Sequence, residues 1–226
     1  MAKKVILNGN TIMDVTDTTA TASDVAEGKI FYDADGVRTE GTAQGGGSFA
    51  PEFVSFYEYE GETLDLTGLD TSNVTSMRRM FNGCFELTSL DLSGFNTSNV
   101  TEMSEMFTSC EFLTSLDLSG FNTSNVETMG SMFEHCESLT SLDLSSFDTS
   151  NVIDFSFMFN GCSSLQELDI RNFDFSNNPS VQHMFNMVPS TCVIYVNQDA
   201  YDFLEDNYTN GNDIQLADLS MLQVVS

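Results

Sequence analysis

The fold is decided by one stretch, residues 89–103, which reads Ser89-Leu90-Asp91-Leu92-Ser93-Gly94-Phe95-Asn96-Thr97-Ser98-Asn99-Val100-Thr101-Glu102-Met103. A period of 26 residues relates this stretch to its neighbours, so its first leucine recurs as Leu64, Leu90, Leu116, Leu142 and Leu168. The same period relates two further columns, Cys84, Cys110, Cys136 and Cys162, and Phe81, Phe107, Phe133, Phe159 and Phe185. Such self-similarity predicts a chain of about five identical structural units.

Two hydrophobic spacings alternate within each unit. Leu90 and Leu92 are separated by polar residues, and this period of two predicts a short strand with its leucines inward. The following apolar residues recur in steps of three and four, which predicts one face of a helix; they are Val100, Met103, Met106, Phe107, Cys110 and Leu113. Asn99 or Ser98 would cap this helix, and Glu102 would lie in its first turn.

One such unit is too small to bury its own apolar face, but stacked units can. We therefore predict the α/β class, with a short solenoid of about five 26-residue strand-helix coils. A parallel sheet would form one side, helices the other, and a continuous core would lie between them.

The runs Leu90-Asp91-Leu92-Ser93-Gly94-Phe95-Asn96-Thr97-Ser98-Asn99-Val100 and Met106-Phe107-(x2)-Cys110-(x2)-Leu113 resemble the BspA-like leucine-rich repeats of bacterial surface proteins. The resemblance covers residues 61–190. It implies adhesion or protein–protein recognition at a cell surface, with no catalytic residues. The fifth coil departs from the pattern, since Asn178 replaces the valine, Pro179 follows it, and Val188 replaces the cysteine.

Both ends of the repeat region carry segments that we interpret as caps, because an uncovered end would expose a sheet edge and the core. Residues 51–60 alternate apolar and polar and predict a strand, which places the solenoid with its N-terminal cap at 51–190. The C-terminal cap, 191–226, is predicted to contain a strand at Val193–Val196, a helix over 198–207 and a further strand at 214–216.

Residues 1–43 form a separate, small β-rich module, followed by a glycine-rich linker at 44–50. Hairpins are predicted around Asn8-Gly9 and Asp35-Gly36, with a capped helical turn over 21–28 between them. About 43 residues with few core positions are marginal as an isolated fold. Self-association or docking on a larger body would stabilise such a module.

Three stretches of this module, Asn8-Gly9, Asp14-Val15-Thr16 and Tyr32-Asp33-Ala34-Asp35-Gly36, resemble N-terminal modules of tail and other virion proteins from phages of Gram-positive hosts. That resemblance implies an anchor on the virion, joined by a flexible hinge to a recognition domain. The N-terminal stretch lacks the long apolar core and cleavage site of a secretory signal, which agrees with this interpretation.

Charge excludes several classes of partner. The formal net charge is −27, from 34 acidic and 7 basic residues. Such a surface repels nucleic acid and anionic lipid. No apolar run approaches the ~18 residues that a membrane span needs. We therefore expect neither nucleic-acid binding nor membrane insertion.

The sequence contains no recognisable catalytic or metal-binding set. Four of the five cysteines recur at the repeat period and are expected to stack as small buried hydrophobes, with disulfide pairing or metal binding as the alternatives. The state of Cys192 is left open. His135 and His183 occupy variable positions and are expected to be ordinary surface or cap residues. We therefore predict that the protein is not an enzyme and uses no cofactor.

One column of polar residues is the candidate binding site. Its acids, here called the Asp strip, lie between inward leucines on the outer face of the predicted sheet; they are Asp65, Asp91, Asp117, Asp143 and Asp169. Serines flank them on both sides, with Ser89, Ser115 and Ser141 on one side and Ser93, Ser119 and Ser145 on the other. The strip is interpreted as a hydrogen-bonded or solvated ladder, as a surface for a basic or hydroxylated ligand, or as a cation site. Exposed aromatic residues that would stack on sugars are missing from this column.

The leading functional prediction is a non-enzymatic phage virion protein, as a tail or head fibre or decoration. Residues 1–43 would anchor it, with homo-oligomer formation through this module left open. The repeats would bind a host cell-surface protein or glycan, or another virion protein. The alternative is a bacterial cell-surface adhesin of the BspA-like family. A hydrolase would need a catalytic set that the sequence does not contain.

Overall fold

The computed structural model describes residues 56, 59–66, 69–210 and 213–225, together with the backbone of four short strands nearer the N-terminus. These strands are β1 (Lys4–Leu7), β2 (Ile12–Asp14), β3 (Ile30–Tyr32) and β4 (Arg38–Glu40). They form an antiparallel sheet in the order β2-β1-β3-β4. The two predicted hairpins, β1–β2 and β3–β4, are thus confirmed. The helical turn predicted over 21–28 and the linker at 44–50 lie outside the described residues.

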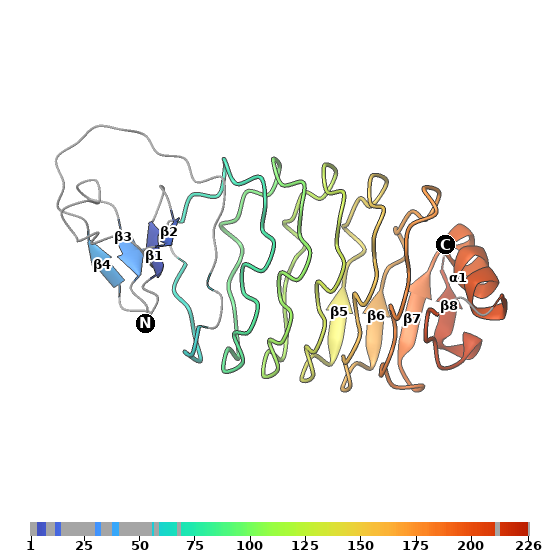
Figure 1. The fold of residues 1–226 in the computed structure, drawn as a ribbon. Helices are drawn as coiled ribbons and strands as arrows, with labels where there is room; N and C mark the ends of the chain where they lie inside the picture. The colour runs from blue at the N-terminus through green and yellow to red at the C-terminus, as the bar shows by residue number, and fades with distance from the viewer. Residues whose placement is uncertain are drawn as a thin grey trace.

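Each repeat of 26 residues forms one coil, and consecutive coils lie side by side (Figure 1). A parallel sheet joins the later coils through β5 (Ser141–Asp143), β6 (Glu167–Asp169), β7 (Val193–Val196) and β8 (Leu222–Val224). Its register pairs Leu142 with Leu168, Leu168 with Ile194, and Ile194 with Leu222. A second line of parallel bridges joins Ser76, Glu102, Thr128, Asp154 and Ser180 in turn. Neighbouring coils therefore pair along two lines, in the register that the sequence period predicts.

The helix predicted in each coil is wrong. Among the described residues, helices occur only near the C-terminus, as α1 (Gln198–Thr209) and a 3-10 helix at Leu219–Met221. The predicted helical segment over 100–113 is instead a series of turns. Two columns of residues in these turns have positive φ and interrupt any helix: Arg79, Glu105, Ser131, Phe157 and His183, and Gly83, Ser109, His135, Gly161 and Met187.

Hydrogen bonding explains why turns replace helices. The amides of Met103, Glu105 and Phe107 donate to carbonyls of the next coil, at Thr128, Gly130 and Met132, over 2.9 to 3.0 Å. The intervening amides close four-residue β-turns, such as Met106 N–H to the Met103 carbonyl at 3.3 Å. A helix would use these amides within its own segment, so stacking and helix formation compete for the same donors. Apolar residues recur in steps of about three residues both along a series of such turns and along one face of a helix.

A column of phenylalanine rings fills the centre of the stack. Ring centroids from Phe56 through Phe81, Phe107, Phe133 and Phe159 to Phe185 are 5.3 to 5.9 Å apart, with nearly parallel planes. Such a pair contributes about 1 kcal/mol beyond its area burial. The contribution recurs at every coil boundary, so the column favours the register with a period of 26.

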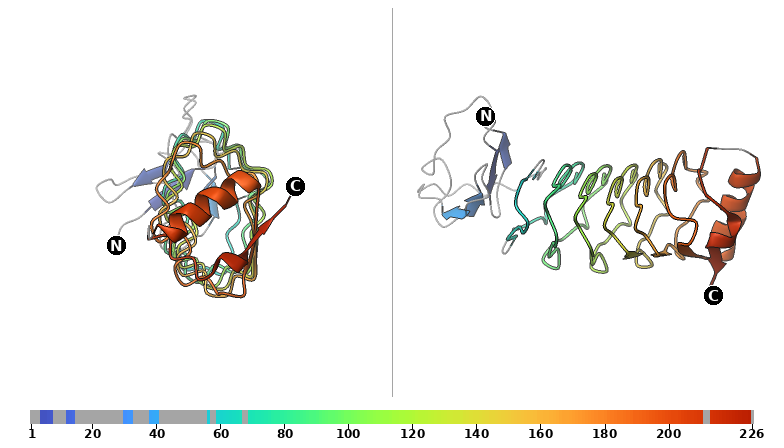
Figure 2. Two further views of the ribbon diagram at one scale, coloured as in Figure 1. Left: turned by 90° about the vertical axis from the view of Figure 1, so that its right-hand side faces the viewer. Right: turned by 90° about the horizontal axis from the view of Figure 1, so that it is seen from below.

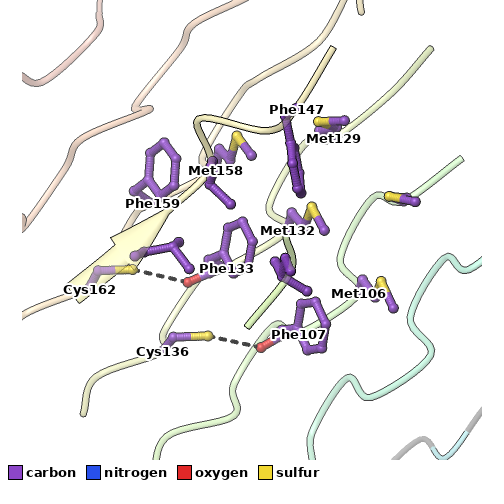
Figure 3. Close-up of a cluster of buried hydrophobic side chains, with 14 of the residues drawn as sticks. Met106, Phe107, Met129, Met132, Phe133, Cys136, Phe147, Met158, Phe159 and Cys162 are labelled. Carbon is purple, nitrogen blue, oxygen red and sulfur yellow. Dashed lines mark hydrogen bonds between the residues drawn. The ribbon is translucent and has the colours of Figure 1, made fainter. Parts of the chain in front are cut away.

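The cysteine column lies beside these rings (Figure 3). The thiols of Cys110, Cys136 and Cys162 donate to phenylalanine carbonyls at Phe81, Phe107 and Phe133, over 3.2 to 3.3 Å. Each such carbonyl also accepts an amide of its own turn, as Phe107 does from Cys110. None of the five cysteines, all of which lie in the described part of the chain, forms a disulfide, and all five are buried. The predicted role as small buried residues is confirmed, with a hydrogen bond to a carbonyl added.

Buried threonines bind the coils at a further position. Thr97 Oγ1 donates to the Asn122 carbonyl at 3.0 Å and accepts the Asn122 amide at 2.8 Å. Thr71 and Thr123 make the same pair of bonds to residues 96 and 148. The hydroxyl thus satisfies a backbone N–H and C=O where the chain turns away from direct coil-to-coil pairing.

The two ends of the stack are closed differently. Phe56 stacks on Phe81 at the first coil, and residues 56, 59 and 60, the described part of the predicted 51–60 strand, form no strand. At the other end α1 lies across the last coil (Figure 2) and buries Ala200 and Leu204. The strand and helix predicted at Val193–Val196 and 198–207 are confirmed. The strand predicted at 214–216 is wrong, because the Ile214 carbonyl instead accepts the Phe185 amide on the turn side, and β8 takes the sheet edge.

The threonine column gives a direct test of coil-to-coil bonding. Valine has nearly the same shape as threonine but lacks the hydroxyl. In the Thr97→Val variant the backbone N–H and C=O of Asn122 therefore lose their hydrogen-bond partner, and we expect the free energy of unfolding to fall by about 1–2 kcal/mol. Urea denaturation followed by circular dichroism measures this change. Thr97→Ser keeps the hydroxyl and serves as the control. Equal stability of the valine and serine variants would contradict the proposed role.

The thiols give a second test. Burial raises the pKa of Cys162 to about 12 and that of Cys192 to about 11, so at pH 8 fewer than about one thiol in a thousand is ionised. We expect no reaction with a thiol-specific disulfide reagent in the native protein, and reaction of five thiols after denaturation. Because folding raises these pKa values, their contribution to stability is complete below pH 9 and is lost as the pH rises through 11 to 12. Rapid native labelling of any thiol would contradict this burial.

Candidate functional site

Four members of the Asp strip are exposed on the outer face of the coils, namely Asp65, Asp91, Asp117 and Asp143, whereas Asp169 is buried. The parallel register places Asp143 of β5 beside Asp169 of β6. Adjacent strands are about 4.8 Å apart, and two carboxylates at that spacing repel by about 1 kcal/mol in water. The fold therefore has to orient or compensate these charges.

A turn orients the carboxylates of Asp91, Asp117 and Asp143. Oδ1 of Asp91, Asp117 and Asp143 accepts the backbone amide two residues later, at 2.9, 3.0 and 2.9 Å. The donors are Ser93, Ser119 and Ser145. This Asx turn ends the inward-facing leucine segment and fixes the direction of the carboxylate. One oxygen of each acid thus has a structural role.

The same contacts keep the strip ionised. Hydrogen bonds from the hydroxyl and the amide of Ser93 hold the pKa of Asp91 below its usual value. The amide and hydroxyl of Ser119 do the same for Asp117, and those of Ser145 for Asp143. Because folding lowers these pKa values, the turns contribute stability above about pH 4 that is lost as the pH falls through the folded-state values.

Arginine replaces serine at the last turn of the strip. Arg171 donates its backbone amide to Asp169 Oδ1 at 3.1 Å, and its Nε lies 2.9 Å from both carboxylate oxygens. The Asp169 carboxylate thereby raises the pKa of the guanidinium. Arg171 neutralises the buried end of the strip and leaves the first four aspartates as its anionic part.

Three of the flanking serines, Ser89, Ser115 and Ser141, lie in one exposed column. Ser89 pairs with Thr63 in a parallel bridge, and Ser141 of β5 pairs with Glu167 of β6. Ser115 occupies the same position in the coil between them. Within the described chain, no protein group bonds to the hydroxyls of these three serines. They are available to a ligand beside the carboxylates.

A groove that was not predicted lies on another face of the coils. It has a volume of about 430 Å³ and is lined by Asn99, Thr101, Asn125, Glu127, Asn151 and Ile153. Nδ2 of Asn99, Asn125 and Asn151 donates to a serine carbonyl of the preceding coil, over 2.7 to 2.8 Å. The predicted role of Asn99 as a helix cap is therefore wrong. Asparagine recurs at this position every 26 residues, and this recurrence was the sequence signal that could have predicted a contact between coils.

The two histidines lie apart from the strip. Nε2 of His183 is 2.8 Å from Asp213 Oδ2, and its ring stacks on Phe157 at 4.9 Å. This contact attaches residues 213–214 to the last coil, which confirms the predicted cap role. His135 Nδ1 lies 3.8 Å from Glu137 at the surface. Among the described residues, no group of three or more His, Cys, Asp or Glu side chains is arranged to hold a metal ion.

The chain is similar to a known protein family. The family described as "Mycoplasma protein of unknown function, DUF285" matches residues 53–142 and 114–213, two overlapping segments that together contain every coil. Residues 1–52 lie outside it. No curated protein and no solved structure matches the chain. No helix in the described part is long and apolar enough to cross a membrane.

The Asx turns of the strip can be tested by titration. Ser93→Ala removes the hydroxyl that bonds to Asp91 but keeps the backbone amide, so we expect the pKa of Asp91 to rise partway toward 3.8. Asp117 has its own turn and serves as an internal control. Carboxyl-carbon NMR between pH 2 and 6 measures both residues. An unchanged pKa of Asp91 would contradict the contact.

Proposed function

The chain belongs to the DUF285 family, a domain found in BspA-like surface repeat proteins, and on that premise we propose that it is a non-enzymatic recognition module. In this proposal residues 61–190 act as one leucine-rich-repeat solenoid. The first four aspartates of the Asp strip, with their flanking serines, bind a basic partner. The observation that carries the proposal is the repeated turn that fixes an ionised carboxylate on the same face of successive coils.

Preorganisation supports this role. A binding surface loses affinity when its side chains must be ordered on association. Here the Ser93, Ser119 and Ser145 amides already hold the carboxylates, and buried columns hold the coils themselves. A basic partner thus meets a fixed row of charges, with serine hydroxyls beside them.

Long-range electrostatics support the same class of partner. With a net charge of −27, the protein attracts cations and repels anions beyond direct contact. Steering of this kind raises the association rate with a basic surface, and salt weakens it. Nucleic acid and anionic lipid would be excluded.

The place of action is part of the proposal. Family membership supports display on a bacterial surface, where a rigid module would mediate adhesion or protein contact. A virion location is the second candidate, supported by the resemblance of residues 1–43 and by the two hairpins found there. Mass spectrometry of purified phage particles and of bacterial surface fractions distinguishes the two locations.

A triple substitution tests the strip itself. Asp91→Asn, Asp117→Asn and Asp143→Asn remove three charges but retain the turns, because Asn96 and Asn122 accept the same i+2 amide contact elsewhere in the chain. With about 0.5 kcal/mol for each exposed ion pair, binding to an immobilised lysine-rich peptide should weaken about tenfold. Its salt dependence should also fall. Intact bacterial cells form a second arm of the same assay.

The matched control is Glu111→Gln, Glu127→Gln and Glu137→Gln, which removes three charges outside the strip. It should retain binding to within about threefold, since only the long-range attraction changes. Equal loss in both triple variants would show that net charge alone attracts the peptide, and the strip would be rejected as the site. Peptide binding without binding to any cell would reject adhesion.

A further inference from the structure

A cleft separates the last coil from the first turns of α1. Its volume is about 580 Å³, and the residues that shape it include Asn172, Asp174, Phe175, Asn197, Asp199 and Phe203. Figure 2 shows α1 lying across the end of the coils, so the cleft occurs once, where the repeat stops. A volume of this size is in the range of small-ligand sites.

Two departures from the repeat place aromatic rings at this cleft: Phe175 lines it, and Phe155 packs against Phe175 from within the core. Phe175 occupies the position of the buried threonines, 26 residues after Thr149, and Phe155 replaces the methionine found at Met129. Their ring centroids are 5.5 Å apart, and the Phe203 ring of α1 stacks on Phe175 at 4.8 Å. The aromatic cluster therefore belongs to this end of the stack.

The polar side of the cleft carries negative charge. Asp174 is partly exposed and Asp199 is exposed, and neither lies beside a basic residue in the cleft lining. Asp174 Oδ1 accepts the Ser176 amide at 2.7 Å, which fixes its carboxylate as in the strip. The nearby Arg171 is engaged by Asp169 outside the cleft.

The amide groups of the lining are already used within the protein. Nδ2 of Asn172 donates to the Ser145 carbonyl at 2.6 Å, and Nδ2 of Asn197 to the Arg171 carbonyl at 2.7 Å. Asn197 Oδ1 accepts the Ala200 amide as the cap of α1. The two carboxylates are therefore the main groups left to recognise a ligand.

The helix dipole opposes a cation at this position, but the carboxylates outweigh it. The N-terminus of a helix is equivalent to about half a positive charge. Asp174 and Asp199 supply two full negative charges, and the Asn197 cap already satisfies one free amide of the helix. The net field in the cleft favours a cation, and the aromatic side favours an apolar stem.

We propose that the cleft binds a lysine or arginine side chain of a protein partner, with its charged end between Asp174 and Asp199 and its stem against Phe175 and Phe203. This site goes beyond the proposed recognition by the Asp strip and shares no residue with it. The cleft would provide a single contact site at the C-terminal end of the stack, whereas the Asp strip provides the same contact on successive coils.

NMR titration of the full ¹⁵N-labelled chain tests the site. The probes are N-acetyl-lysine-N-methylamide, its uncharged analogue N-acetyl-norleucine-N-methylamide, and n-butylammonium. We expect the lysine probe to shift the amides of Ser176 and of residues 199–203, with the norleucine probe at least tenfold weaker. Equal binding of norleucine, or shifts confined to the strip, would overturn the proposal. Tighter binding of n-butylammonium than of the lysine probe would indicate a free amine as ligand and reject the protein partner.

A double variant assigns the two carboxylates. Asp174→Asn is expected to fold normally, because Asn96 and Asn122 occupy the same repeat position, and Asp199→Asn completes the pair. Binding of the lysine probe should weaken at least tenfold. Asp148→Asn with Asp202→Asn is the matched control, since it changes the same repeat column and the same helix outside the cleft. It should retain affinity within twofold, and an equal loss would reject the site.

The triple substitution in the Asp strip leaves Asp174 and Asp199 unchanged. It therefore distinguishes a failure of the proposed strip from a failure of the proposed cleft site. The Asp91, Asp117 and Asp143 triple variant should bind the lysine probe in the cleft as the unmodified chain does. Loss of the cleft shifts in that variant would show that the probe had reported the strip.

Discussion

Backbone hydrogen bonds between one coil and the next set the register of the whole stack. Amides such as those of Met103, Glu105 and Phe107 point along the stack instead of closing a helix. Chemically alike residues consequently lie directly above one another, which aligns the Phe rings and places the thiols of Cys110, Cys136 and Cys162 against carbonyls of the preceding coil. A shift of one residue would lose all of these contacts together, so the register is specified many times over.

The same constraint determines what the surface can do. A side chain on the outer face of one coil is repeated on the next coil at the spacing of adjacent strands. For aspartate this repetition is unfavourable, because neighbouring carboxylates repel each other. The structure gives Asp91, Asp117 and Asp143 an amide donor and a hydroxyl from the residue two positions later, and it gives the buried Asp169 an arginine. Turn formation and charge presentation are thus two effects of one contact. A binding role can therefore coexist with a structural role at the same residue.

The ends of the stack are where repetition stops and individual features arise. Phe175 replaces a threonine whose hydroxyl would have bonded to a further coil, and Phe203 of α1 covers the ring that takes its place. His183 and Asp213 attach the final segment to the turn side, while β8 extends the sheet. Each of these residues departs from the repeat because it no longer faces a copy of itself. The cleft beside α1 follows from this change of partner.

Several features could be predicted from the amino-acid sequence: the period, the columns, the inward leucines, the burial of the cysteines, both N-terminal hairpins and the strand and helix of the C-terminal cap. These features depend on local patterns and on identity at fixed spacing, which a single chain displays directly. Other features depend on how the coils stack: residues 100–113 form turns, Asn99 bonds to Ser72 of the preceding coil, and the amide of Ser93 holds the Asp91 carboxylate. Apolar steps of three and four fit a helix and a series of turns equally well. The choice between them depends on whether the backbone amides bond within the segment or to the neighbouring coil, and that is settled only when the coils stack.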